Sequence, residues 1–276
     1  MFFKGFTGIG KITRTGHSPS PVYFRFVNAD VALTQGVNFF LPSYGNSDDH
    51  ENLRRIVAPT TGDVAGRISL ILAENMADIW YQLAYTAEEF LLELYFGNKR
   101  KRSFANTKIE SLTFDCRGGE LVSVNFDTVS KSYVQEESDI SYISTFGKYN
   151  QKLVDWTKVG MDGFKPSIDI LSFSYTIKNN LLSIKTAQSL LPSHINRAIQ
   201  EVSGNITLVD VMLPDYATDP YEIKVNEITF RVEDVLSVTH DIVNHWSYRT
   251  PLSADMIMTT LDWTRVDKVQ QSVPTP

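Results

Sequence analysis

Apolar and polar residues alternate over many short stretches of the chain, and this pattern predicts β-strands. The stretches are rich in β-branched and aromatic residues and are bounded by Gly, Pro, Asn and Asp, as is typical of strands separated by turns. In the first half they cover residues 22–26, 64–72, 109–116 and 120–129. In the second half they cover residues 168–177, 181–186, 202–212, 222–232, 236–243 and 256–266. The pattern therefore predicts a mainly β protein.

Turn-forming residues indicate how some of these strands connect. Residues 31–41 read as two short strands that turn at Gln35–Gly36, and Asn179–Asn180 predicts another turn. Gly118–Gly119 stands between two alternating runs, which is a typical hairpin pattern. Residues 42–63 are polar and rich in turn residues, so we expect a long loop there. Residues 1–20 are rich in Gly, Ser, Thr and Pro and predict a loose N-terminal arm.

One segment has a helical period. Between residues 79 and 94 apolar side chains recur at intervals of three and four, which places them along one helix face. They are Ile79, Trp80, Leu83, Ala84, Ala87, Phe90, Leu91 and Leu94. Asn75 stands where an N-cap belongs, and Gly97 follows the last periodic residue. The pattern predicts a single helix over residues 75–96 that packs on a sheet.

The chain contains a weak internal repeat. The pattern V-small-G-polar-I-hydroxyl-L occurs in both halves, first as Val64, Gly66, Ile68 and Leu70 and then, 138 residues later, as Val202, Gly204, Ile206 and Leu208. Downstream, residues 112–114 match 228–230, and residues 121–127 match 235–241. A repeat of this kind is typical of a duplicated domain. We therefore expect one β domain over residues 1–135, a connector over 136–166 and a second β domain over 167–276.

Composition limits the classes of partner. The chain has 26 basic and 32 acidic side chains and a net charge of −6, which argues against a surface built to hold phosphates tightly. Its single cysteine, Cys116, forbids an internal disulfide and is consistent with assembly in a reducing cytoplasm. The first residues have no continuous apolar core of a signal peptide, and no apolar stretch approaches the ~20 residues that span a bilayer. We expect neither a leader nor a membrane segment.

Catalytic motifs are missing from the sequence. Neither a nucleophile elbow, a phosphate-binding loop, a dinucleotide fingerprint nor a zinc-protease motif occurs. Gly8–Ile9–Gly10 resembles half of a phosphate loop, but the rest of that motif is absent. Asp48–Asp49–His50 could hold a metal, although such a group in a polar loop is usually solvated. Cys116 lacks an identifiable base and is expected to be a buried thiol.

The remaining candidate groups favour a structural protein as well. His240 and His245 are expected at an interface or on the surface. The carboxylates of the predicted helix are explained by its polar face. We expect no enzyme activity and no cofactor.

The segments SFSYTIKNNL (172–181), LPSHI (191–195) and QEVSGNITL (200–208) together resemble the tail tube proteins of long-tailed bacteriophages. The first half repeats the theme with DVAGRISLIL, an amphipathic helix and ESLTFDCRGGELVSVNFDTV. The resemblance covers roughly residues 22–130 and 168–245. It implies a small β-barrel or sandwich flanked by one helix, with protomers that pool their strands into a wall around a lumen.

The resemblance also implies a functional context. The chain would form stacked rings of three or six copies in the virion tail, and DNA would pass through without tight binding. Its partners would be the tape measure, terminator and baseplate proteins, and in some tails a sheath. An acidic lumen would repel the DNA backbone over the ~10 Å screening length at ~0.1 M salt. Asp115, Asp127 and Asp241 are candidates for the lumen because they alternate with core residues.

The basic run Lys99, Arg100, Lys101 and Arg102 follows the predicted helix and opens a predicted loop. It can be a plain surface loop, a contact between rings or a DNA contact. We place it at the inter-ring contact, because stacked acidic subunits need complementary charge. The 42–63 loop and the arm are further candidates for contacts between rings.

Three other functions remain open on the sequence. The chain could form the tube of a contractile or gene-transfer particle, or it could be a terminator or adaptor that forms a single ring. It could also be a β-sandwich carbohydrate-binding or hydrolytic module, which would need a cleft with aromatic residues and paired carboxylates.

Overall fold

The computed structural model describes residues 8–15, 21–40, 56–96, 100–137, 152–162, 170–186, 191–209, 227–240, 245–249 and 258–266. The strands of the first half are β1 (Gly8–Arg14), β2 (Val22–Phe26), β3 (Asn28–Phe40), β4 (Ile56–Ile71), β5 (Phe90–Phe96), β6 (Arg100–Arg117), β7 (Ser123–Ser130) and β8 (Ser132–Glu137). Those of the second half are β9 (Val159–Asp162), β10 (Ile170–Lys178), β11 (Leu181–Ile184), β12 (His194–Arg197), β13 (Glu201–Val209), β14 (Ile228–Val232), β15 (Leu236–His240), β16 (His245–Arg249) and β17 (Met258–Val266). The helical segments are η2 (Glu74–Met76), α1 (Ala77–Thr86) and η3 (Trp156–Lys158). The prediction of a mainly β protein with one α-helix is confirmed for this part of the chain.

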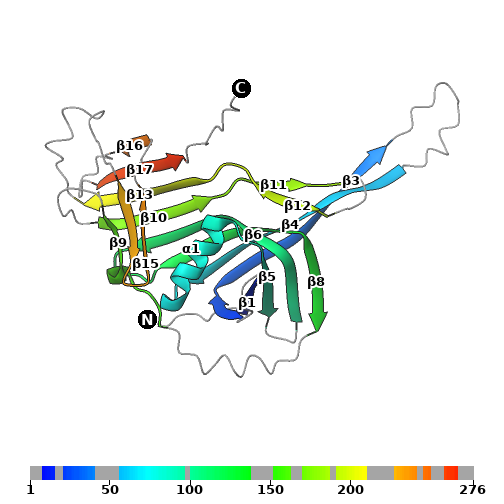
Figure 1. Ribbon diagram of the computed structural model, residues 1–276, viewed down its shortest axis with the longest axis horizontal. Coiled ribbons are helices and arrows are strands. Elements are labelled where there is room, and N and C mark those ends of the chain that lie inside the picture. The colour runs from blue at the N-terminus through cyan, green and yellow to red at the C-terminus, as the bar shows by residue number, and fades with distance from the viewer. Residues whose placement is uncertain are drawn as a thin grey trace, which may run out of the picture.

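A single antiparallel run of strands crosses both halves of the chain. Its order is β3-β4-β7-β6-β10-β13-β17-β16. The junction is the pairing of β6 with β10, in which Phe114 lies opposite Tyr175. Strands of the two predicted domains, 1–135 and 167–276, therefore share one sheet (Figure 1).

The two halves of this run have the same internal order. In the first block, β3-β4-β7-β6, β4 pairs with β7 and β7 pairs with β6. In the second block, β10-β13-β17-β16, β13 pairs with β17 and β17 pairs with β16. In both blocks, therefore, the second strand along the chain pairs with the fourth, and the fourth pairs with the third. Residues 64–70 and 202–208 occupy the same place, as the second strand of each block. The downstream match differs, because β14 and β15 form a separate sheet with β9. By sheet position β17 and β16, rather than β15 and β14, correspond to β7 and β6.

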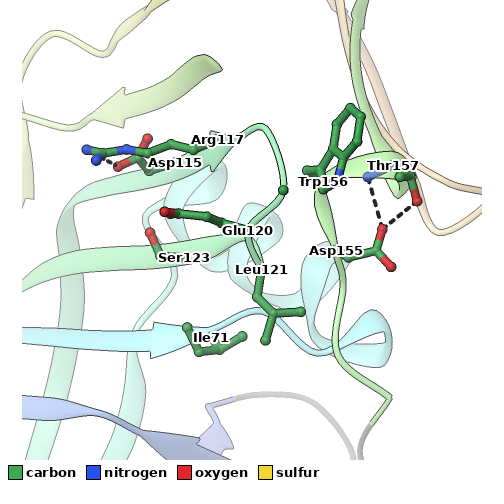
Figure 2. A pocket seen from close by; sticks show the side chains of 10 residues that line it. Ile71, Asp115, Arg117, Glu120, Leu121, Ser123, Asp155, Trp156 and Thr157 are labelled. Carbon is green, nitrogen blue, oxygen red and sulfur yellow. Dashed lines mark hydrogen bonds and ion pairs between the residues drawn. The ribbon is translucent and has the colours of Figure 1, made fainter. Parts of the chain in front are cut away.

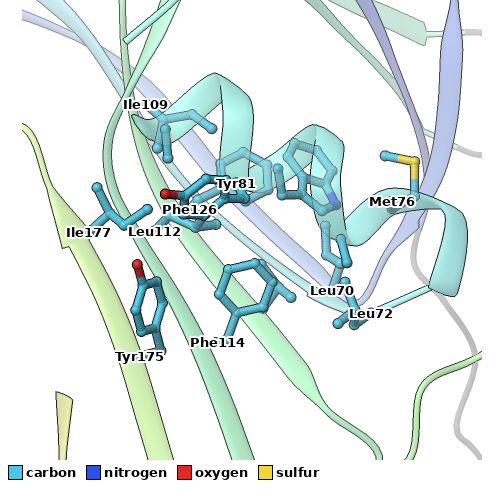
Figure 3. Close-up of a cluster of buried hydrophobic side chains, with 14 of the residues drawn as sticks. Leu70, Leu72, Met76, Tyr81, Ile109, Leu112, Phe114, Phe126, Tyr175 and Ile177 are labelled. Carbon is cyan, nitrogen blue, oxygen red and sulfur yellow. The ribbon is translucent and has the colours of Figure 1, made fainter. Parts of the chain in front are cut away.

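α1 and the strands β1, β2, β5, β9, β14 and β15 form a second layer over the apolar face of the run. Trp80 of α1 is fully buried, with ring centroids 5.0 Å from Phe24 of β2 and 4.7 Å from Phe126 of β7. On the other half, Phe230 of β14 stacks on Tyr175 at 4.5 Å. Figure 3 shows the shared core, with Phe114 and Tyr175 directed towards it from neighbouring strands. Burying each of these side chains contributes ~1.5–3 kcal/mol to folding. With two layers packed face to face, the described strands form a sandwich and not a closed barrel.

The predicted helix over 75–96 is too long. α1 ends at Thr86, and Ala87 has the left-handed conformation (φ 51°) that terminates it. Residues 90–96 form β5, in which Phe90, Leu92 and Leu94 are buried at a period of two. The helical and strand periods coincide at Phe90 and Leu94, and this coincidence misled the sequence interpretation. Asn75 is not the N-cap, because it lies within η2.

Two predicted turns are also wrong, because both sites lie inside long hairpins. β3 continues through Gln35 with only a register shift before Val37. The chain does not reverse at Asn179–Asn180, since β10 leads into β11 and returns through β12 and β13. By contrast, the hairpin at Gly118–Gly119 is confirmed by the pairing of β6 with β7.

The expected loose segments contain more structure than the sequence indicated. Residues 8–14 of the predicted arm form β1, which pairs with β2 and β5. β4 begins at Ile56, inside the predicted 42–63 loop, and residues 41–55 lie outside the described residues. The predicted connector contains η3 and β9, and β12 lies between the strands predicted over 181–186 and 202–212.

Candidate functional site

The face of the large sheet opposite the core is a broad polar surface. Along β6, Leu112, Phe114 and Cys116 point to the core, whereas Ser111, Thr113 and Asp115 alternate on the other side. Because directly paired residues share a face, strand pairing places one polar row across the sheet: Asn28, Ser69, Asn125, Thr113, Thr176, Ser203 and Thr264; the side chain of His245 lies outside the described residues. A second row runs through Ser123, Asp115, Ser174, Asn205 and Asp262. We call this surface the polar face.

Short side chains on the polar face bond to one another across the strands. Ser69 Oγ donates to Asn125 Oδ1 at 2.6 Å, and the hydroxyls of Thr113 and Thr176 are 3.0 Å apart. These contacts join β4 to β7 and β6 to β10, the strand pair at which the two halves meet. Hydroxyl and amide groups that are satisfied by their neighbours leave this surface hydrophilic without concentrating charge on it.

Two of the three predicted lumen residues lie on the polar face, and each has an arginine nearby. Arg67 Nε and Nη2 contact the carboxylate of Asp127 at 2.8 and 3.3 Å, and Ser111 donates to the same group at 2.8 Å. Burial acts to raise the pKa of Asp127, but these hydrogen bonds and the charge of Arg67 outweigh it, so the pKa lies below its usual value. Asp115 has Arg117 at 3.7 Å. Asp241 lies outside the described residues.

Where their side chains are described, the residues predicted for wall strands lie on the core side of β4 and β13. Val64, Ile68 and Leu70 are buried, as are Val202 and Ile206; Leu208 stands further along β13.

The two repeat glycines are both closely packed against a neighbouring strand. A Cβ on Gly66 would come within 2.6 Å of the Val31 side chain, and one on Gly204 within 2.8 Å of the Trp263 ring. Each glycine makes room for a side chain of an adjacent strand, and a Cβ on Gly204 would also come within 2.4 Å of the Ser174 carbonyl oxygen.

The basic run lies in a strand, which corrects its prediction as a loop. Arg100, Lys101 and Arg102 open β6, and Lys99 lies outside the described residues. Lys101 contacts Glu136 at 2.7 Å and the buried Glu93 at 3.3 Å, and these interactions raise the pKa of Lys101. Lys101 is therefore paired with carboxylates of its own chain and not with those of a neighbour. Arg100 is exposed.

An open cleft of about 520 Å³ adjoins one end of the polar face (Figure 2). It lies between the β6–β7 turn, the end of β4 and the segment 155–157. Its apolar members are Ile71, Leu121 and Trp156, and its charged members are Asp115, Arg117, Glu120 and Asp155. The indole of Trp156 is 43% exposed although it belongs to an ordered turn. We call this site the Trp156 cleft.

Backbone and side-chain bonds fix the walls of the Trp156 cleft. Trp156 N donates to Glu120 O at 3.0 Å, and Val122 N donates to Val154 O at 3.0 Å. Asp155 accepts from Thr157 N at 2.9 Å, and the Thr157 hydrogen bonds lower the pKa of Asp155. Sequence reasoning missed this site, because its walls come from three segments that are far apart in the sequence, and the only signal was an aromatic residue in an apparent connector.

The structure bears on several groups that the sequence offered as candidates for chemistry, among the residues it describes. They contain no group of three His, Cys, Asp or Glu side chains able to hold a metal ion; Asp48–Asp49–His50 lies outside them. Burial and the charges of Asp115 and Asp155 raise the pKa of Cys116 to about 11, so its thiol is inert at neutral pH. Gly8 and Gly10 lie in β1 beneath the rings of Phe26 and Phe24, as packing positions rather than a phosphate loop.

His240 is buried, which corrects its prediction as a surface or interface residue. Its Nε2 is 2.7 Å from the Tyr175 hydroxyl, and Arg265 contacts its Nδ1. Because arginine can only donate, Nδ1 of His240 accepts a hydrogen bond from Arg265. Nε2 therefore carries the ring proton and donates a hydrogen bond to the Tyr175 hydroxyl. This contact ties β15 to the large sheet.

In comparisons with known proteins, no protein-family model and no curated protein matches the chain. Within the part of the chain that the structure describes, no helix has the length and apolar character needed to cross a membrane.

Proposed function

We propose that the chain is a structural subunit of a phage tail tube, which forms stacked rings of three or six copies and conducts DNA without tight binding. The observation that carries the proposal is the eight-strand antiparallel run with its polar face. A sheet with a packed core on one side and a row of small hydroxyl and amide side chains on the other suits the wall of an aqueous channel.

The edges of the sheet support assembly. Among the described strands, β3 and β16 end the run, and each has a partner on one side only. Edge strands present unpaired N–H and C=O groups that can pair with another chain. Pairing of the β3 edge with the β16 edge of a neighbour would continue the wall, and the repeated strand order would let one chain supply two similar segments of a ring.

The charge balance of the polar face supports passage of DNA. Among the described side chains, its acidic members include Asp30, Asp115, Asp127, Glu201 and Asp262, and its basic members include Arg67, Arg117 and Lys178. Arg67 and Arg117 are close to carboxylates, which weakens their attraction for phosphate. A face of this kind gives DNA few cationic sites to hold it.

In this role the chain has no enzymatic activity, belongs to the virion tail, and meets the tape measure, terminator and baseplate proteins at the ends of the tube. Electron microscopy of the concentrated protein tests the proposal. Hollow tubes with a regular axial repeat are expected, and DNA should not shift the protein in a gel at ~0.15 M salt. A protein that stays monomeric at all concentrations, or forms only single rings, contradicts the tube.

A saccharide-binding module is a second candidate, and the Trp156 cleft is the observation that favours it. An exposed indole beside carboxylates and an arginine can stack on a sugar ring and bond to its hydroxyls. Titration of the monomer with oligosaccharides, compared with Trp156→Ala, tests this function. Saturable binding that the substitution abolishes would favour it over the tube.

A further inference from the structure

The two-stranded ribbon of β11 and β12 carries an uncovered apolar face. Leu182 is 58% exposed and Ile184 is 44% exposed, although both stand in a regular strand. The residues opposite them, Asn196 and His194, are exposed as well. Among the described strands, β11 and β12 pair only with each other. Two neighbouring apolar side chains on an isolated ribbon indicate a surface that another element covers.

The ribbon is also preorganised. Asn180 Nδ2 donates to Ile199 O at 2.9 Å, and Ser193 Oγ donates to Ile184 O at 3.0 Å. Arg197 Nη1 donates to Tyr85 O at 2.7 Å, which anchors the base of the ribbon to the end of α1. A surface held in place before binding loses less entropy on association.

The charges of the ribbon are opposite to those of the Trp156 cleft. The ribbon and the residues between its strands, 181–197, contain Lys185, His194 and Arg197 and no Asp or Glu. The cleft holds Asp115, Glu120 and Asp155 against a single arginine, and it also exposes an apolar wall. The two surfaces therefore complement each other in both sign and polarity.

The ribbon and the cleft lie at opposite ends of the same strands. Ser172 at the start of β10 pairs with Arg117, which lines the cleft, and Lys178 at its end leads towards β11. Figure 1 shows β11 and β12 projecting from the end of the sheet where β3 also projects. Ile71, at the other end of β4, lines the cleft. One molecule thus cannot bring its own ribbon to its own cleft.

We propose that the β11–β12 ribbon of one subunit docks in the Trp156 cleft of a second copy of this chain. Leu182 and Ile184 contact Trp156, Ile71 and Leu121, and the basic ribbon faces the acidic rim. The contact is head-to-tail, so it propagates along the strand direction and produces an open stack. Its place between successive rings of a tube rests on the proposed function, whereas the contact itself does not.

The small size of this contact is compatible with stacking. A ribbon of two four-residue strands buries less surface than a stable dimer needs. In a ring, however, several identical contacts form at once, and their combined affinity far exceeds that of one. Single subunits should therefore associate weakly, and rings should stack strongly.

Site-specific cross-linking tests the contact. The variant Leu182→Cys/Glu120→Cys carries one thiol on the ribbon and one on the cleft rim, and the native Cys116 is buried. With a short bis-maleimide we expect a ladder of covalent oligomers without an upper limit. A mixture of the two single variants should stop at dimers, and neither single variant alone should cross-link. Leu182→Cys/Val134→Cys, with the second thiol exposed on β8, is the matched control and should give no ladder.

A second variant measures the consequence of losing the contact. Leu182→Asp/Ile184→Asp changes only exposed side chains, so we expect an unchanged melting temperature and at least a tenfold higher concentration for assembly. Trp156→Ala should have the same effect from the cleft side.

The outcomes separate the two proposals. Dimers from Leu182→Cys alone would show that ribbons pair with ribbons and would overturn the contact. Tubes without a ladder would overturn the contact and leave the tube intact. A ladder without tubes or rings would support the contact and contradict the proposed function. Absence of both at high concentration overturns the contact as well.

Discussion

The two blocks of the large sheet share a strand order but are covered differently. The first block, β3-β4-β7-β6, lies under α1 and the strands β1, β2 and β5, with Trp80 at the centre of the packing. The second block, β10-β13-β17-β16, lies under the small sheet of β9, β14 and β15, with Phe230 at the centre. Two blocks with the same strand order are therefore covered by different elements, and in each case a large aromatic side chain of the covering layer packs on the sheet.

The covers are not independent of each other. Lys158, at the end of η3, contacts both Glu74 beside α1 and Glu233 in the β14–β15 turn. Phe230 also reaches across the junction to Phe114 of β6 at 5.2 Å. Two similar blocks with a common sheet and a common core should unfold together.

The largest expected effect comes from removing the central aromatic residue of each cover. Trp80→Ala and Phe230→Ala should each lower the free energy of unfolding by ~3–5 kcal/mol. Because the blocks share one sheet, both variants should show a single denaturant transition monitored by circular dichroism. Two separate transitions, with only one displaced in each variant, would show that the blocks are independent domains.

Asn179 tests how the second block is tied to the helix of the first. Its fully buried amide donates to Ala84 O at 2.7 Å and Ile109 O at 2.9 Å, and it accepts from Gln200. Asn179→Ala leaves buried polar groups without partners and should cost ~2–3 kcal/mol.

Asn180→Gly is the matched control for Asn179. It loses one exposed bond but relieves a positive φ of 45°, so it should change stability by less than ~0.5 kcal/mol. Equal losses of unfolding free energy in the two variants would contradict the assigned role of Asn179.

The repeat glycines distinguish the two blocks more finely. A Cβ at position 204 meets the rigid Ser174 carbonyl oxygen at 2.4 Å, whereas at position 66 it meets the side chain of Val31. Overpacking costs ~1–3 kcal/mol. Gly204→Ala should fall at the upper end of that range and Gly66→Ala at the lower end, measured by urea denaturation. The reverse order would mean that the first block packs more rigidly.

The smallest expected effect is a pH dependence of the free energy of unfolding. It arises at Glu74, where Lys158 connects the two covering layers. Hydrogen bonds from Lys152 and Lys158, followed by their charges, lower the pKa of Glu74 to about 2. A depressed pKa stabilises the folded state above the ordinary value of about 4.5, and this contribution is lost as the pH falls towards 2. The free energy of unfolding should decline over this window more steeply in the wild type than in Glu74→Gln. Parallel profiles would exclude Glu74 as a source of acid sensitivity.

The alternation of apolar and polar residues, together with turn residues, was sufficient to predict several features of the fold. The alternation over 109–116 and 120–129, with Gly118–Gly119 between them, correctly indicated a hairpin, because turn and strand patterns agree there. The matching glycine motifs correctly predicted two strands, which the structure places equivalently. The acidic residues at 115 and 127 could be placed opposite the core side chains from alternation alone.

The interpretation failed where two patterns overlapped or where partners are distant in the chain. Residues 90–96 satisfy a helical and a strand period at once, and only pairing with β1 and β6 selects the strand. Asn179 looks like a turn residue, yet burial against the carbonyl groups of Ala84 and Ile109 holds it inside a long hairpin. The Trp156 cleft could not be foreseen, because its walls meet only after β4, β6 and the segment 152–158 have come together.

What the sequence determined by itself is the β character, the duplicated strand motif and the polarity of each strand face, because these depend on neighbours one to four residues away. The tertiary structure alone decided that both halves share one sheet, that β17 and β16 complete the second block, and that ribbon and cleft occupy opposite ends. Strand order, register and the meeting of distant segments depend on long-range packing, which no local period records.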